Sequence, residues 1–107
     1  MNVNGRIWFE TSQGTFAGEG RIALLEKVKQ YGSINKAAKS MKMSYRQAWE
    51  EIDTMNSQYK KPLVIKVSGG IGGGGSEVTP EGEKVIKLYK KIKANFNEFV
   101  KQQSKSL

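Results

Sequence analysis

The sequence of 107 residues contains neither cysteine nor histidine. Without cysteine the chain can form no disulfide framework and no thiolate-ligated metal site. Without histidine it lacks the most common metal ligand and the most common general base, although catalysis by carboxylates or lysines remains possible. The apolar runs are far shorter than a membrane span, and the N-terminus has no apolar stretch typical of a secretory signal. We therefore expect a cytoplasmic protein that makes no membrane contact and carries no cofactor.

Positive charge is in clear excess. There are 18 Lys and Arg residues against 10 Asp and Glu, which gives a net charge of +8. Such an excess favours a polyanionic partner, most often nucleic acid and sometimes an anionic membrane, although charge alone is a weak indicator. The length and the share of hydrophobic residues, 37%, suit one globular domain over residues 1–107.

The first half of the sequence predicts a short β segment followed by helices. Residues 3–9 are expected to form a strand that a turn at 11–14 folds back, so residues 1–17 form an N-terminal strand or hairpin. Apolar residues at three-residue steps predict a helix that ends before Gly32, a residue suited to a C-terminal cap. Residues 20–59 are predicted to hold all the helices of the central part.

Two capped helices follow in close succession. Ser33 is suited to cap a short helix over 34–40, and Ser44 is suited to cap a helix that runs to about Tyr59. Residues 41–43 between them leave room only for a tight turn. Two helices joined in this way form a helix-turn-helix.

The second half predicts a hairpin and a long helix. Strands are expected over 63–67 and 77–79, and Thr79-Pro80-Glu81 has the residue types that begin a helix. A hairpin directly after a helix-turn-helix is a wing, here residues 63–79, and the last helix is expected over 80–103. The predicted fold class is therefore mainly α with small β hairpins, a winged helix-turn-helix with a long C-terminal helix.

A run of glycines separates the two predicted wing strands, and Gly70–Gly75 matches the GxGxxG string. A nucleotide cradle requires a helix directly after the glycines, whereas a strand intervenes here. We interpret the run as the wing tip, where glycine lets backbone N–H groups approach phosphates or a minor groove. A tip that makes no contact remains the alternative, because Lys66 is the nearest basic residue.

The second helix of a helix-turn-helix presents a polar N-terminal end to DNA. Arg46 suits guanine or phosphate, Gln47 suits adenine, and Glu50 can accept from a cytosine amino group. Any single lysine of this region could equally belong to a solvated face. Trp49 is expected to be a half-buried core residue that packs on the first helix or the wing, and stacking on DNA is the alternative. The candidate DNA-binding residues are Ser33, Lys36, Lys39, Ser44, Tyr45, Arg46, Gln47, Glu50, Lys66, Gly70, Gly72, Gly73 and Gly74.

Apolar residues of the last helix recur at steps of four and three, which is a heptad pattern. We expect them to form the interface of a homodimer that places two reading helices about 34 Å apart. The alternative is that the helix folds back over its own domain, over Trp8 and Phe9. The predicted interface residues are Val85, Tyr89, Ile92, Phe96 and Phe99.

Several short motifs, spread over nearly the whole chain, resemble the N-terminal domain of the ModE family of molybdate-responsive regulators. A weaker likeness, through Val78-Thr79-Pro80-Glu81-Gly82, is to the winged helix of LysR-type regulators. One difference is Lys42, in a turn where many helix-turn-helix proteins carry glycine. The ModE motifs are Gly18-Glu19-Gly20-Arg21, Leu24-Leu25, Gly32-Ser33-Ile34, Ala37-Ala38-Lys39, Met43-Ser44-Tyr45-Arg46, Ala48-Trp49, Ile52-Asp53, Met55-Asn56, Gly69-Gly70, Gly72-Gly73-Gly74-Gly75 and Leu88-Tyr89.

The resemblance implies a DNA-binding transcription regulator that reads the major groove with the helix starting at Ser44. In that family molybdate is bound by C-terminal modules, so molybdate is not expected to bind this chain alone. Two other classes of function stay open at this stage. One is a winged helix that binds proteins and never touches DNA, and the other is a small enzyme or oxyanion-binding protein that uses the glycine loop.

Overall fold

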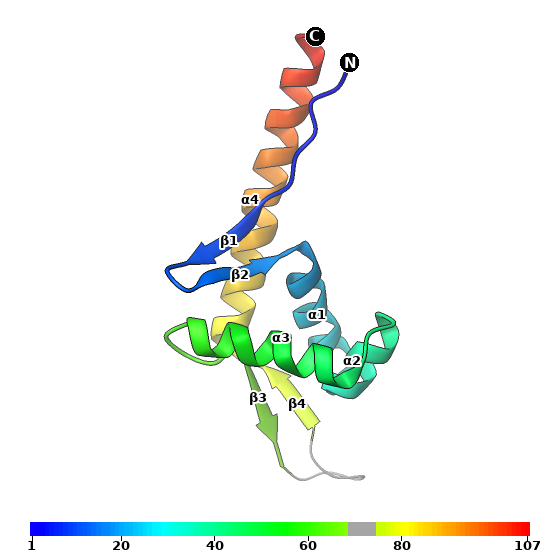
Figure 1. Ribbon diagram of the computed structural model, residues 1–107, viewed down its shortest axis with the longest axis vertical. Helices are drawn as coiled ribbons and strands as arrows, with labels where there is room; N and C mark the ends of the chain where they lie inside the picture. Colours follow the sequence, from blue (N-terminus) through cyan, green and yellow to red (C-terminus); the bar gives the residue numbers. More distant parts are fainter. Residues whose placement is uncertain (69–74) are drawn as a thin grey trace.

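The computed structural model describes residues 1–68 and 75–107 and confirms the predicted fold class (Figure 1). Helices form a core between two small antiparallel hairpins, and a long C-terminal helix projects from this body. In these residues no helix is both long enough and apolar enough to cross a membrane. The elements are β1 (Trp8–Thr11), β2 (Gly14–Gly18), α1 (Glu19–Tyr31), α2 (Ile34–Ser40), α3 (Tyr45–Gln58), β3 (Val64–Val67), β4 (Gly75–Val78) and α4 (Pro80–Lys105).

The N-terminal prediction is partly wrong, because the first strand begins at Trp8 and not at residue 3. β2 ends at Gly18, which pairs with Trp8, so no strand remains for residues 3–7 to pair with. This segment instead runs beside α4 (Figure 1). The Val3 N–H donates to Ser104 Oγ at 2.9 Å, and the Ile7 carbonyl accepts from the Tyr89 hydroxyl at 3.2 Å.

The helix caps form where the sequence predicts them. Gly32 adopts φ +65°, a left-handed conformation that glycine tolerates, and its N–H donates to the Val28 carbonyl at 2.8 Å. The Ser33 side chain accepts from the Lys36 N–H at the start of α2. Ala37, on the same short helix, is fully buried, and such small side chains allow neighbouring helices to approach closely.

The wing is shifted slightly from its predicted bounds. β4 begins at Gly75, two residues before the expected strand, and pairs there with Val67. Ser76, the next residue of β4, joins this strand to the end of α1, since its N–H donates to the Gly32 carbonyl at 3.0 Å. The predicted wing-tip contacts Gly70, Gly72, Gly73 and Gly74 lie outside the described residues.

A single side chain, Asn56 of α3, holds the start of β3 (Val64–Val67). Its Oδ1 accepts from the backbone N–H groups of Leu63 and Val64, at 2.8 and 3.3 Å. Its amide nitrogen donates to the Val64 carbonyl at 3.0 Å. Leu63 is fully buried and Val64 is nearly so. The wing is therefore tied to α3 through backbone groups that water cannot readily satisfy.

The long helix α4 corrects the predicted dimer interface. Val85 and Tyr89 are each only 3% exposed, because they pack into the domain's own core, so they cannot line a surface between subunits. Phe9 packs edge-on against Tyr89 with ring centroids 5.5 Å apart, which is the fold-back contact weighed as the alternative. Phe96 lies against Gly5 of the N-terminal segment.

Ion pairs add a second link between α1 (Glu19–Tyr31) and α4. Lys93 lies 2.7 Å from Glu19, and its hydrogen bond and charge lower the pKa of the Glu19 carboxyl. The same hydrogen bond raises the pKa of Lys93. Lys90 pairs with Glu26 in the same way. These two lysines are thus paired with acidic groups of α1.

Gly82 lies where α4 (Pro80–Lys105) crosses the base of the wing. A Cβ there would stand 2.5 Å from the Leu63 carbonyl oxygen and 2.7 Å from Val78 Cγ1. Gly82→Ala should therefore lower the free energy of unfolding by about 1–3 kcal/mol, measured by urea denaturation. Gly20→Ala is the matched control, since no atom lies within 4 Å of its added Cβ. It should be neutral or slightly stabilising, and an equal loss in both variants would contradict the close-approach argument.

Removing the Asn56 amide should also destabilise the fold. Asn56→Ala leaves the N–H groups of Leu63 and Val64 without their acceptor, so we expect a loss of about 1–3 kcal/mol in thermal or urea unfolding. Asn95→Ala, at an exposed position of α4, should stay within about 0.5 kcal/mol of the wild type. A similar, small effect of both substitutions would show that the wing does not depend on Asn56.

Candidate nucleic-acid interface

The helix-turn-helix and the wing lie at the end of the molecule opposite the two chain termini (Figure 1). α3 (Tyr45–Gln58) begins here, and the Ser44 side chain accepts from the Gln47 N–H at 3.0 Å. Ala48, Ile52 and Met55 bury the opposite face of the helix in the core. This burial fixes which side of α3 faces outward, and the first turn of the helix presents its polar side chains to solvent.

The two side chains best suited to read bases are both held by acidic neighbours. Arg46 Nε donates to Glu50 Oε1 at 3.0 Å, and Gln47 Nε2 donates to Glu51 Oε2 at 3.0 Å. The Arg46 side chain is 88% exposed and that of Glu50 57%. An ion pair this exposed contributes little to stability, so Arg46 can exchange it for a base or phosphate at small cost.

The turn between the helices contains a residue in an unusual conformation. Lys42 has φ +56°, and it is the only residue other than glycine with positive φ in the described part of the chain. Many helix-turn-helix proteins place glycine there because a side chain costs about 1 kcal/mol or more in this region. Lys42 adopts this conformation despite the cost, and its side chain is exposed.

α2 (Ile34–Ser40) carries the other predicted phosphate contacts. Ser33 caps it, and Lys36 and Lys39 are both exposed on its surface. Trp49, on α3, lines a shallow depression with Ile65 of the wing and is 40% exposed. Trp49 thus lies toward the wing and is half-buried, as expected, although it does not belong to the core cluster.

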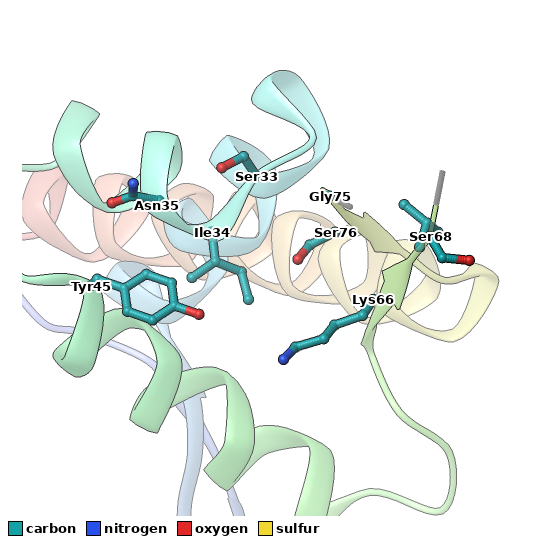
Figure 2. A pocket seen from close by; sticks show the side chains of 9 residues that line it. Ser33, Ile34, Asn35, Tyr45, Lys66, Ser68, Gly75 and Ser76 are labelled. Carbon is teal, nitrogen blue, oxygen red and sulfur yellow. The ribbon is translucent and has the colours of Figure 1, made fainter. Parts of the chain in front are cut away.

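Three of the predicted contact residues meet in one recess, although they are far apart in the sequence. Ser33, Tyr45 and Lys66 come from the start of α2, the start of α3 and the wing, and together they line a cavity of about 550 Å³. Figure 2 shows the Tyr45 hydroxyl and the Lys66 ammonium directed toward each other across Ile34. Lys36, Lys39, Arg46, Gln47 and Glu50 do not line this recess.

Sequence reasoning missed other residues of the recess. Asn35 and Ser68 add an amide and a hydroxyl to its rim, and Ser76 adds a nearly buried polar side chain, 8% exposed. The pairing of β3 with β4 places Ser76 opposite Lys66. A signal was available, because Ser76 directly follows the run of glycines, yet its partner strand could not be read from the sequence.

Comparison with known proteins also indicates a helix-turn-helix protein. Residues 20–83 match the model of the family described as "Bacterial regulatory helix-turn-helix protein, lysR family". The chain is 38% identical over 102 residues to the molybdenum transport protein ModE of Azotobacter vinelandii, which covers 95% of this chain and 38% of that protein. It is 42% identical over 89 residues to the DNA-binding transcriptional dual regulator ModE of Escherichia coli K12, covering 83% and 34%. The resemblance to ModE is thus confirmed, and the chain spans little more than a third of these relatives.

Solved structures confirm the fold. The DNA-binding domain of BenM in complex with benA site 1 DNA superposes with a TM-score of 0.58 at 17% identity, covering 82% of this chain and 96% of that one. A mutant of MepR from a multidrug-resistant S. aureus clinical isolate superposes with a TM-score of 0.62 at 13% identity, covering 80% of this chain and 64% of that one. With the family match spanning the helices, the wing and the start of α4, the chain belongs to the bacterial regulatory helix-turn-helix proteins of the lysR family.

Proposed function

We propose that this chain is a sequence-specific, DNA-binding transcription regulator that reads the major groove with the start of α3 (Tyr45–Gln58). The observation that carries the proposal is the capped, outward-facing first turn of α3 beside the wing, in a chain of a regulatory helix-turn-helix family. The names of its ModE relatives, which include a DNA-binding transcriptional regulator, support it. A protein-binding winged helix or an enzyme finds no comparable support in these comparisons, and the family match over residues 20–83 favours DNA binding over oxyanion binding.

In this proposal the contacts divide into two kinds. Arg46 and Gln47 meet base edges, because the first turn of α3 is the part of the helix that enters the groove. Lys36 and Lys39 meet phosphates, since they are exposed on the neighbouring α2. Glu50 holds Arg46 through their ion pair until DNA binds. The predicted contact of Glu50 with a cytosine amino group is a further contact to test.

A homodimer through α4 (Pro80–Lys105) remains part of the proposal, on a revised surface. Leu88, Ile92 and Phe99 are 51%, 39% and 57% exposed. At roughly 100° per residue they fall within about 40° of one another around the helix. This exposed α4 strip keeps Ile92 and Phe99 of the predicted interface and adds Leu88. It leaves out the buried Val85 and Tyr89, and Phe96, which lies against Gly5. A second copy of the chain would cover it and set the spacing of two reading helices.

Molybdate binding by residues 1–107 alone is still not expected. An oxyanion site requires donors that converge in an enclosed space from which water is excluded. The recess of Figure 2 is instead lined partly by the exposed side chains of Lys66 and Tyr45. The absence of molybdate binding stays a prediction.

Base readout by α3 predicts different effects for two basic residues. Arg46→Ala should cost about 1–3 kcal/mol of binding free energy and relax the preferred base at one position of each half-site. Lys39→Ala should weaken binding to all sequences alike. Selection of binding sites from random DNA, followed by anisotropy titration, measures both effects. Lys105→Ala, at the far end of α4, is the control and should change neither. An unchanged motif and affinity for Arg46→Ala would disprove base readout by this helix start.

The exposed α4 strip predicts a dimer in solution at tens of micromolar, measured by light scattering. Ile92→Glu places a charge in the apolar strip and should shift the protein toward monomer. Lys101→Glu introduces the same side chain about 140–180° away from the strip residues around the helix, so it should leave the dimer intact. A wild-type monomer at this concentration, or equal dissociation by both variants, would contradict the proposed surface.

A further inference from the structure

The recess between the helix-turn-helix and the wing has the composition of an anion site. The Lys66 ammonium and the Tyr45 hydroxyl are directed toward each other in it, and Ser33, Asn35, Ser68 and Ser76 are the other polar residues of its lining (Figure 2). None of the described residues that line it is acidic. None of the salt bridges among residues 1–68 and 75–107 uses Lys66. The ammonium is therefore available to pair with an anion from outside the protein.

The open shape of the recess favours an anion that belongs to a larger molecule. A water molecule takes up about 30 Å³ in the liquid, and a tetrahedral oxyanion is only a few times larger. The recess measures about 550 Å³ and is open toward solvent on the side of Tyr45 and Lys66, whose side chains are exposed. A free oxyanion would leave most of this space to water, whereas a phosphate with its neighbouring sugars would fill far more of it.

The walls of the recess are held in place by contacts outside it. On one side the Ser76 N–H donates to the Gly32 carbonyl, and a Cβ on Gly75 would lie 2.6 Å from that same carbonyl oxygen. On the other side Asn56 fixes the start of the strand that carries Lys66. Lys66 and Tyr45 thus face each other across a gap whose width is set by the fold (Figure 2).

We propose that this recess binds one sugar–phosphate unit of the DNA backbone, with Lys66 paired to the phosphate and the Tyr45 hydroxyl donating to a phosphate oxygen. The inference rests on the proposed function and deepens it, since the wing and α3 would then contact the same DNA strand at one phosphate. Contacts to phosphate fix register and affinity but carry no base sequence. The recess therefore sets how deeply the start of α3 enters the groove and does not determine which bases are preferred.

The test compares Lys66→Gln and Tyr45→Phe with the matched control Lys61→Gln, an exposed lysine outside the recess. Binding to a selected duplex is measured by anisotropy between about 50 and 200 mM salt. Lys66→Gln should reduce the slope of log K against log salt by about 0.9. Tyr45→Phe should weaken binding roughly two- to tenfold. Neither should alter the selected motif, and Lys61→Gln should leave the slope unchanged.

Neutral methylphosphonates, placed one at a time along the duplex, identify the phosphate. At one position per half-site they should weaken the wild type much more than they weaken Lys66→Gln, which has already lost the charge pair. A salt slope for Lys66→Gln equal to that of Lys61→Gln would contradict phosphate binding in the recess without contradicting DNA binding. So would losses from the methylphosphonate and from Lys66→Gln that add up at every position. Saturable NMR shifts of Tyr45 with submillimolar inorganic phosphate would also overturn it, in favour of a free oxyanion. A wild type that binds no DNA would overturn the proposed function, and the recess with it.

Discussion

The side chain of Asn56 is the contact on which the geometry of the wing depends. It meets the first backbone groups of β3 with both its oxygen and its nitrogen, so it fixes the position and the direction of the strand. An apolar side chain there could hold the strand by packing, but it could not satisfy these N–H groups. Because Asn56 belongs to α3, the helix that would read DNA also positions Lys66.

The positive charge of this chain is divided between two tasks. Lys29, Lys90 and Lys93 pair with acidic residues and join α1 to α4, away from the proposed interface. Among the described residues, the basic side chains at the helix-turn-helix and the wing have no such structural partners, except Arg46, whose partner Glu50 lies on the same exposed face. Each such pair removes one positive and one negative charge together, so the net charge of +8 does not show where the unpaired basic groups lie.

The long helix α4 shows why a heptad pattern does not identify a partner. Val85 and Tyr89 continue the apolar steps of Ile92 and Phe99, yet the first two are core residues and the last two are exposed. The N-terminal segment covers part of the same helix, with Gly5 against Phe96. Different parts of one apolar face can contact the domain core, the chain's own N-terminal segment and another molecule. The spacing of the apolar residues does not show which part contacts which partner.

The sequence by itself determined the local structure, because caps and periodicity act over a few residues. Ser33, Ser44 and Thr79 each accept the backbone hydrogen bond that their position predicts. The tertiary structure decided what depends on distant segments. It left residues 3–7 without a strand partner, buried Val85 and Tyr89, and brought Ser33, Tyr45 and Lys66 to one recess. The packing of α1, α3 and the wing places these side chains together, and no spacing in the sequence encodes that distance.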